Sequence, residues 1–345
     1  MRAARLHAYG QPLVIDDIPT PEPGPGEVLL RVEGAGFCHS DIHVMDGDIQ
    51  ILARMPLTLG HENAGVVAEV GRGVTAVREG QSVAVFGGWG CGLCAYCVTG
   101  HEQLCETPQW AGLSKYDGGY ADYMLIPHER YLVKLTTLHP TQAAPLTDAA
   151  LTPYRAIKKA LAFLEPDHHA LLIGVGGLGQ YGLKGLKLMA ACPVIAVDTA
   201  DDKLAIARQL GAAHTINARD PDLTARIHDL TQGHGVNAAF DFVGTDDTLA
   251  LAISQTRALG KVSQLGLAGG GARLKPLETS RFEVLFEATL WGTIKELREV
   301  LALAESGKLT LIETELAPLE EINNVYGRLK RGEVAGRAVI APLTV

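Results

Sequence analysis

The densest group of potential metal ligands in the sequence is a run of four cysteines, Cys91, Cys94, Cys97 and Cys105. Zn²⁺ favours four soft ligands in a tetrahedron, and four thiolates at this spacing can close one and leave no position for a substrate. The run therefore predicts a structural zinc that stabilises a lobe with little core of its own. The alternatives are free or disulfide-bonded thiols and a nucleic-acid-binding finger, but no basic stripe accompanies the cysteines.

A second group of residues has the glycine spacing of a phosphate-binding turn. It runs between an apolar stretch at 170–173 and a helix-compatible stretch at 180–191, and consists of Gly174, Val175, Gly176, Gly177, Leu178 and Gly179. We expect Gly174 to permit the tight turn, Gly176 to let the backbone approach a pyrophosphate, and Gly179 to let helix and strand pack closely. The N–H groups of the helix N-terminus would then meet the anion. A glycine-rich turn in an ordinary α/β protein is the alternative, and the strand–turn–helix context favours a dinucleotide.

Asp198 ends the next predicted strand, at 194–197. A carboxylate there can accept both hydroxyls of the adenosine ribose and repels a 2′-phosphate. The following residues, 199–202, include no arginine that would reverse this preference. The sequence therefore predicts NAD rather than NADP as the cofactor.

Two further segments, 36–43 and 60–74, hold Cys38 and His61. Spacing alone does not pair these two side chains. Both segments nevertheless resemble the catalytic zinc signature of medium-chain alcohol dehydrogenases, and the four-cysteine run and the glycine turn follow in that family's order. The resemblance covers essentially the whole chain and is greatest to bacterial NAD-dependent secondary alcohol dehydrogenases.

The resemblance implies that Cys38 and His61 are two ligands of a catalytic zinc. Many members use a second cysteine as the third ligand, but this chain resembles the secondary-alcohol subgroup around Asp148, which implies that Asp148 takes that place. The alternative for Asp148 is an N-cap of the helix that follows. Thiolate, carboxylate and neutral imidazole together would leave Zn²⁺ formally uncharged with a fourth position open, which favours deprotonation of an alcohol near neutral pH.

The same resemblance assigns the acid–base groups. Ser40 would accept the alcohol proton and His43 would pass it to solvent, because histidine titrates near neutral pH; a surface role is the alternative for His43. Asp41 would orient His61 through its other ring nitrogen. Glu62 would either ligate zinc transiently or serve as a structural carboxylate.

Cofactor and pocket positions are also implied by the resemblance. His39 and Arg337 match positions that meet the pyrophosphate, Lys203 one near the adenosine ribose, and Thr152 one beside the nicotinamide. Trp110 and Trp291, with Phe86 and Trp89, match segments that line the substrate pocket, although core or interface packing is the alternative. Aromatic walls favour apolar substrates. We therefore expect secondary alcohols and ketones rather than polyols, with a primary alcohol–aldehyde pair as the alternative.

The elements that position these residues fall into two regions. Short alternating runs at 28–32, 63–70, 81–86 and 120–126 indicate a mainly β region. Apolar strands at 170–173, 194–197, 238–242 and 262–265 alternate with helices such as 202–210, which indicates a doubly wound parallel sheet. Further strands, at 309–316 and 335–341, would return to the first region. The expected fold class is α/β: a GroES-like mainly β catalytic domain at 1–148 and 290–345, and a Rossmann NAD-binding domain at 149–289.

Composition limits the other functional classes. The 345 residues carry a net charge of −9, which disfavours a nucleic-acid partner. The N-terminal residues have no apolar signal region and the longest apolar runs are too short for a bilayer, so we expect a cytoplasmic protein without a membrane partner, acting on a small-molecule alcohol or ketone as a homodimer or homotetramer. A zinc-free NAD(P)H reductase resembling quinone reductases would lack the cysteine and histidine groups, and a non-catalytic zinc scaffold would not need the glycine turn.

Overall fold

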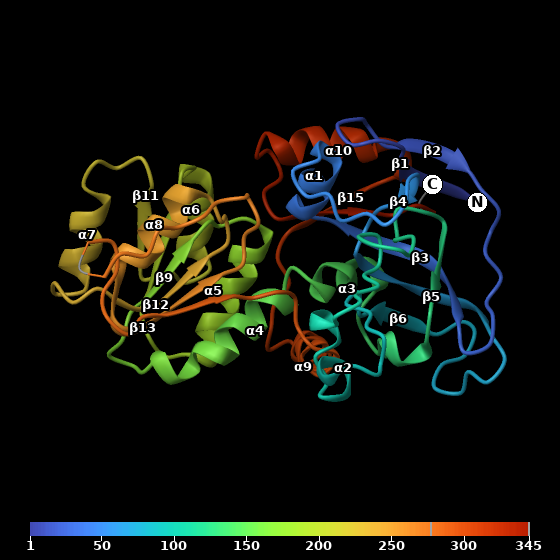
Figure 1. Ribbon diagram of the computed structural model, residues 1–345, viewed down its shortest axis with the longest axis horizontal. Coiled ribbons are helices and arrows are strands. Elements are labelled where there is room, and N and C mark those ends of the chain that lie inside the picture. The colour runs from blue at the N-terminus through green and yellow to red at the C-terminus, as the bar shows by residue number, and fades with distance from the viewer. Residues whose placement is uncertain (277, 344–345) are drawn as a thin grey trace. The chain divides into compact units, whose positions relative to one another are not determined.

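The structure is a computed structural model and describes residues 1–276 and 278–343. The chain divides into two compact units. Unit 1 comprises Met1–Leu151 and the described residues from Trp291 onward, and unit 2 comprises Thr152–Leu290. The first unit thus ends at Leu151 where the sequence suggested 148, and it resumes at Trp291 where the sequence suggested 290. The N-terminus and the last described residues belong to unit 1 (Figure 1).

Unit 2 contains a six-stranded sheet in the order β11-β10-β9-β12-β13-β14, and every neighbouring pair is parallel. The strands are β9 (Ala170–Ile173), β10 (Val194–Asp198), β11 (His214–Asn217), β12 (Val236–Asp241), β13 (Thr256–Gln264) and β14 (Leu285–Ala288). The helices of this unit, labelled in Figure 1, are α4 (Leu151–Ala160, whose first residue belongs to unit 1), α5 (Gly177–Met189), α6 (Asp201–Gln209), α7 (Leu223–Leu230) and α8 (Asp246–Gln255).

Both faces of this sheet are buried. Leu171 and Ile173 of β9 belong to one apolar cluster, whereas Leu172 between them belongs to another that includes residues of α4 and α5. Alternate residues of a strand point to opposite faces, so the two clusters are the two covered sides of one sheet. The predicted doubly wound parallel sheet is confirmed.

Unit 1 is built on a seven-stranded, largely antiparallel sheet, ordered β15-β16-β3-β5-β6-β8, with β7 also paired to β3. Its strands are β3 (Val28–Phe37), β5 (Glu62–Val70), β6 (Ser82–Val85), β7 (Tyr123–Ile126), β8 (Leu132–Lys134), β15 (Thr314–Ala317) and β16 (Arg337–Ile340). A smaller sheet contains β1 (Arg2–Leu6), β2 (Val14–Asp17) and β4 (Leu57–Thr58). The helices are α1 (His39–Asp46), α2 (Ala95–Val98), α3 (Pro140–Ala143), α9 (Ile294–Glu305) and α10 (Ile322–Lys330).

Strand β3 is longer than the run at 28–32 that the sequence suggested. Its second half contains Gly34 and Gly36, which weaken the strand pattern. A Cβ atom at Gly34 would lie 2.8 Å from the backbone of Thr141, and one at Gly36 would lie 2.0 Å from the Glu62 carboxylate. The glycines are therefore required by close neighbours, and the strand continues through them to the residue before Cys38.

The last part of the chain returns to unit 1 as expected. Strand β16 pairs with β3, opposite Gly36 and Phe37, and β15 adds to its outer side. The run predicted at 309–316 forms a strand only from Thr314, because the residues before it follow α9 as a connection. Among the described helices, none has the length and apolar character needed to cross a membrane.

Candidate metal and nucleotide sites

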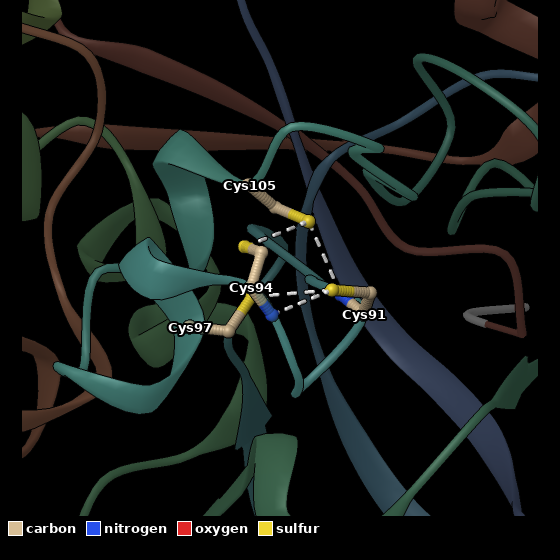
Figure 2. A group of neighbouring side chains, drawn as sticks. All are labelled: Cys91, Cys94, Cys97 and Cys105. Atoms are coloured by element: carbon tan, nitrogen blue, oxygen red, sulfur yellow. Dashed lines mark hydrogen bonds between the residues drawn. The ribbon is translucent and has the colours of Figure 1, made fainter.

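The four clustered cysteines follow β6 and surround α2, and their sulfur atoms converge on one point (Figure 2). The Cys91 and Cys97 sulfurs are 4.0 Å apart, and those of Cys94 and Cys105 are 3.9 Å apart. Four Zn–S bonds of about 2.3 Å at tetrahedral angles would place the sulfurs about 3.8 Å apart, so the cluster fits zinc. All six cysteines of the chain are free thiols.

The backbone around this cluster already favours thiolates. The N–H groups of Leu93 and Cys94 donate to Cys91 Sγ at 3.4 and 3.3 Å, and these bonds lower the pKa of Cys91 to about 6. Burial acts in the opposite direction on Cys97 and raises the pKa of that thiol to about 12. A bound metal is what would hold all four as thiolates together, since coordination deprotonates a thiol outright.

A second cluster brings Cys38, His61 and Asp148 together from three parts of unit 1. Cys38 is the N-cap of α1, His61 directly precedes β5, and Asp148 follows a short turn at 144–147. Asp148 Oδ2 lies 3.4 Å from His61 Nε2 and 3.9 Å from Cys38 Sγ. A tetrahedral zinc with a nitrogen and an oxygen ligand would separate those two atoms by about 3.4 Å, so this set also fits the metal. The Asp148 carboxylate faces Cys38 and His61, which is the arrangement expected of a ligand.

Asp41 supports this cluster from the first turn of α1. Its Oδ2 accepts the backbone N–H of Cys38 at 3.0 Å, which stabilises the start of the helix. Its Oδ1 lies 3.3 Å from His61 Nδ1, so His61 turns one ring nitrogen to Asp41 and the other to Asp148. Burial alone would lower the pKa of His61, but Asp41 and Asp148 outweigh it and raise that pKa well above its usual value.

The glycine turn lies in unit 2 between β9 and α5. Gly174 has a φ of +89°, which a side chain would disfavour, and a Cβ at Gly179 would lie 1.9 Å from the Gly174 carbonyl oxygen. Gly176 is the N-cap of α5, and nothing lies within 4 Å of where its Cβ would be. Gly174 and Gly179 thus have the features predicted from their spacing, whereas the approach of a pyrophosphate to Gly176 stays a prediction. Gly177 and Leu178 begin the helix whose N–H groups can meet an anion.

The chain is similar to known proteins that bind zinc and depend on NAD, in agreement with the metal and nucleotide sites described above. Residues 24–137 match the family model of the alcohol dehydrogenase GroES-like domain, and residues 177–306 match that of the zinc-binding dehydrogenase domain. An NAD-dependent alcohol dehydrogenase of Sulfurisphaera tokodaii is 38% identical over 99% of this chain and 100% of its own. The chain belongs to the zinc-dependent medium-chain alcohol dehydrogenases.

Solved structures of this family superpose closely on the chain. The alcohol dehydrogenase of the archaeon Aeropyrum pernix has a TM-score of 0.94 at 39% identity, covering 99% of this chain and 100% of that one. Acetophenone reductase from Geotrichum candidum, solved in complex with NAD, has a TM-score of 0.87 at 32% identity, covering 99% and 97%. The predicted combination of a GroES-like unit and a Rossmann unit is confirmed.

In this alcohol dehydrogenase, Glu62 and Arg337 form a buried ion pair. Arg337 Nε donates to Glu62 Oε2 at 2.9 Å, and Nη2 donates to the other carboxylate oxygen. Burial raises the pKa of Glu62 to about 7, with Arg337 opposing the rise. The resemblance placed Arg337 at the pyrophosphate and Glu62 near zinc. The structure places the guanidinium against Glu62, so its contact with the cofactor stays a prediction.

The groups expected to move the proton lie on α1. Ser40 Oγ is 3.6 Å from Cys38 Sγ, and His43 follows one turn later with its Nδ1 3.3 Å from Asp48 Oδ2. His39, at the start of α1, is exposed. Ser40 is thus beside the metal cluster, and His43 is half-buried toward solvent. This order suits a proton relay, and the roles of the two residues stay predictions.

The four aromatic residues predicted to line the pocket fall into two groups. Trp291 packs edge-on against the His61 ring, with ring centres 5.6 Å apart. Trp110 packs against Trp291, with ring centres 6.3 Å apart. Phe86 and Trp89 are fully buried and pack instead against Tyr131. The first pair is therefore beside the metal cluster, whereas the second pair contributes to the aromatic core of unit 1.

The remaining cofactor positions lie in unit 2. Asp198 Oδ2 accepts the backbone N–H of Val175 at 2.7 Å, and Oδ1 accepts that of Ala200 at 3.0 Å, so this carboxylate also fixes the glycine turn. Lys203 is partly exposed on α6, and Thr152 is buried in α4.

Sequence reasoning did not identify Tyr120, whose hydroxyl contacts Asp41. No sequence motif indicates this role, because Tyr120 follows a glycine-rich loop and has the sequence context of an ordinary core residue.

Proposed function

We propose that this chain is an NAD-dependent alcohol dehydrogenase that prefers secondary alcohols and their ketones. The observation that carries the proposal is the convergence of Cys38, His61 and Asp148, whose ligand atoms, together with one of Glu62, lie within 4.8 Å of one another. Three protein ligands of mixed type are typical of catalytic zinc, which keeps a fourth position for the substrate, whereas the four-cysteine site has none. The family membership supports the reaction class.

The residues of the chain have separate tasks in this reaction. When bound, zinc supplies a Lewis acid and NAD supplies the hydride acceptor. Cys38, His61 and Asp148 hold the metal, and Asp41 fixes the ring of His61. Ser40 takes the proton of the alcohol and His43 passes it toward solvent. Arg337 keeps Glu62 engaged in the ion pair, so that Glu62 does not occupy the position needed by the substrate.

The cofactor preference follows from Asp198. Its carboxylate is fixed by two backbone N–H groups at the end of β10, where a ribose-binding acidic residue is expected in this fold. A fixed negative charge there opposes a 2′-phosphate. The similar acetophenone reductase was solved with NAD.

The substrate preference rests on the aromatic wall beside His61. Trp291 is held by its indole N–H, which donates to the Thr147 carbonyl oxygen at 3.0 Å. Trp110 packs against it with the ring planes 67° apart, and the two indoles form an apolar wall that suits ketones with aliphatic or aryl groups; a similar structure is that of an acetophenone reductase.

A substrate panel tests the preference. We expect kcat/KM for 1-phenylethanol and cyclohexanol with NAD to exceed that for ethanol, 1-butanol and D-arabinose by about tenfold or more, since one or two extra apolar contacts are worth about 1–3 kcal/mol. Equal or higher values for the primary alcohols would establish the primary alcohol–aldehyde alternative. A preparation that holds metal but oxidises none of these alcohols would contradict the proposed reaction.

We further propose that the chain forms a homodimer or homotetramer. Strand β14 is an edge of the sheet in unit 2 and exposes Leu285 and Phe286, with 56% and 43% of their surfaces accessible. The opposite edge, β11, is polar. An exposed apolar edge pairs readily with another chain, and a second copy offers the same strand. Light scattering of the protein and of the variant Phe286→Lys tests this: a monomeric parent protein would contradict it.

The four-cysteine site also bears on the compartment. Its thiols must stay reduced to bind metal, which supports a cytoplasmic location. Fractionation of cells expressing the chain, with thiol trapping of the cysteines, tests this proposal; recovery outside the cytoplasm would contradict it.

A further inference from the structure

Tyr120 is a fully buried tyrosine whose hydroxyl reaches the support of the metal cluster. Its hydroxyl lies 2.7 Å from Asp41 Oδ2 and 3.1 Å from the Gly36 carbonyl oxygen. A phenol has one proton to donate, and the shorter contact to a charged oxygen is the stronger one. Tyr120 therefore donates to Asp41.

The ring of Tyr120 is fixed by both ligand-bearing segments. It stacks on Phe37, the residue before Cys38, with ring centres 5.3 Å apart and planes 13° from parallel. On the other segment, a Cβ at Gly60, the residue before His61, would lie 2.8 Å from the Tyr120 ring. The backbone N–H of Tyr120 also donates to the Leu59 carbonyl oxygen at 3.0 Å. One side chain thus packs against the neighbours of two proposed zinc ligands.

The contacts of Tyr120 affect the metal cluster through the carboxylate of Asp41. The carboxylate is fully buried, and its Oδ2 accepts from the Cys38 backbone and from Tyr120. Its Oδ1 faces His61 Nδ1 at 3.3 Å, an ion-pair contact, and neither atom has a hydrogen-bond partner in residues 1–276 and 278–343. The two donors to Oδ2 oppose rotation of the carboxylate and favour the orientation in which Oδ1 faces the imidazole.

We propose that Tyr120 is a positioning residue of the catalytic metal site: its hydroxyl fixes Asp41, and Asp41 in turn orients the ring of His61. The proposal rests on the metal-binding role given above to Cys38, His61 and Asp148. Groups that orient a histidine ligand change metal affinity by about 10–100-fold when removed. Tyr120 contacts Asp41 and not His61 itself, so we expect its removal to change metal affinity less, by about 3–10-fold.

The variant Tyr120→Phe tests this role because it keeps the stacked ring and removes only the hydroxyl. The holoenzyme is mixed with a chelator, and the release of each zinc is followed with a colorimetric indicator. We expect the catalytic zinc to leave about 3–10-fold faster than from the parent protein, in line with the effect expected on metal affinity. Zinc at the four-cysteine site should leave at an unchanged rate, which serves as an internal control.

A spectroscopic readout separates positioning from general loosening. Co²⁺ placed at the Cys38 site should show visible bands that shift in Tyr120→Phe, because the ligand geometry changes. The matched control is Tyr131→Phe, which also removes a buried phenol donor, here to the Gly90 carbonyl oxygen at 2.8 Å. Tyr131 does not contact Asp41, so this variant should leave the Co²⁺ bands and the release of the catalytic metal unchanged.

A double-variant cycle tests the route through Asp41. If Tyr120 acts through that carboxylate, Asp41→Asn combined with Tyr120→Phe should release metal no faster than Asp41→Asn alone. Unchanged release and unchanged bands in Tyr120→Phe, or effects of the two substitutions that multiply fully, would overturn the proposal while leaving the proposed function in place. Absence of metal at the Cys38 site in the parent protein would overturn both.

Discussion

Arg337 holds the carboxylate of Glu62 in a two-pronged ion pair that passes over Gly36. In the sheet, Glu62 of β5 and Val339 of β16 both pair with Gly36 of β3, on its two sides. Because Gly36 has no side chain, Glu62 can extend across β3 to the strand that carries Arg337. The pair therefore joins the C-terminal part of the chain to the residue that follows His61.

The variant Arg337→Met should destabilise unit 1 by about 3 kcal/mol or more, because it leaves a buried carboxylate without its partner. Glu62 and Arg337 expose 0% and 3% of their side chains, so solvent does not screen the loss. Denaturant unfolding with zinc held constant measures the change.

The control for this prediction removes both charges. Glu62→Gln combined with Arg337→Met should recover most of the stability, since no buried charge is then left unpaired. A single Arg337→Met variant as stable as the parent protein would show that the ion pair is not formed in solution.

The variant Cys97→Ser should reduce the zinc content from two ions per subunit to one. Cys97 is the most buried part of the α2 turn, and its thiolate is required to complete the tetrahedron. Without the metal, residues 91–105 of the loop after β6 have few apolar contacts, as the exposed Leu93 and Val98 indicate. Limited proteolysis should then cut this loop, while Co²⁺ still binds at the Cys38 site.

The matched control for the loop is Cys192→Ser, which changes a buried cysteine of unit 2 that belongs to neither cluster. It should keep two zinc ions and the protease resistance of the loop. Two zinc ions in Cys97→Ser would argue against the four-cysteine site.

Sequence patterns predicted the sites whose residues are close in the chain. The four cysteines and the glycine turn are local, so residue type and spacing fix the chemistry, and β9 has the bounds predicted for its strand. The pairs Tyr120–Asp41 and Arg337–Glu62 are 79 and 275 residues apart, and no local pattern links them. The Arg337–Glu62 contact depends on strand register in the sheet of unit 1, and the Tyr120–Asp41 contact depends on how α1 packs against the loop before β7; both are set by packing over the whole unit.

The variant Asp198→Asn should weaken discrimination against NADP. The amide keeps an oxygen that can accept the N–H of Val175, but it loses the charge that repels a 2′-phosphate. We expect the ratio of kcat/KM with NAD to that with NADP to fall by about tenfold, or about 1.4 kcal/mol, mainly through a gain with NADP. Asp198→Ala should also lose NAD affinity, because the turn is no longer held. Ratios equal to that of the parent protein in both variants would assign cofactor choice to another residue.

Glu287 of β14, at the edge of the sheet in unit 2, forms ion pairs with two lysines. Its carboxylate accepts from Lys261 Nζ at 2.7 Å and from Lys159 Nζ, and Lys261 is only 5% exposed. Burial by itself would raise the pKa of Glu287, but the hydrogen bonds from the lysines outweigh it and lower that pKa below its usual value of 4.5. A carboxyl whose pKa is lower in the folded state stabilises the fold above the unfolded value. That contribution is lost as the pH falls through the folded value.

The variant Glu287→Gln should therefore cost about 1–2 kcal/mol at pH 7, with allowance made for the partial exposure of the carboxylate. The difference from the parent protein should begin to shrink as the pH falls below 4.5 and should disappear under more acidic conditions, because the parent carboxyl is then neutral as well. Thermal unfolding of both proteins between pH 7 and the acid range measures this convergence. Glu283→Gln changes a nearby exposed carboxylate and should have no effect beyond about 0.5 kcal/mol. A constant difference between Glu287→Gln and the parent protein at every pH would show that the lysines do not act through the charge of Glu287.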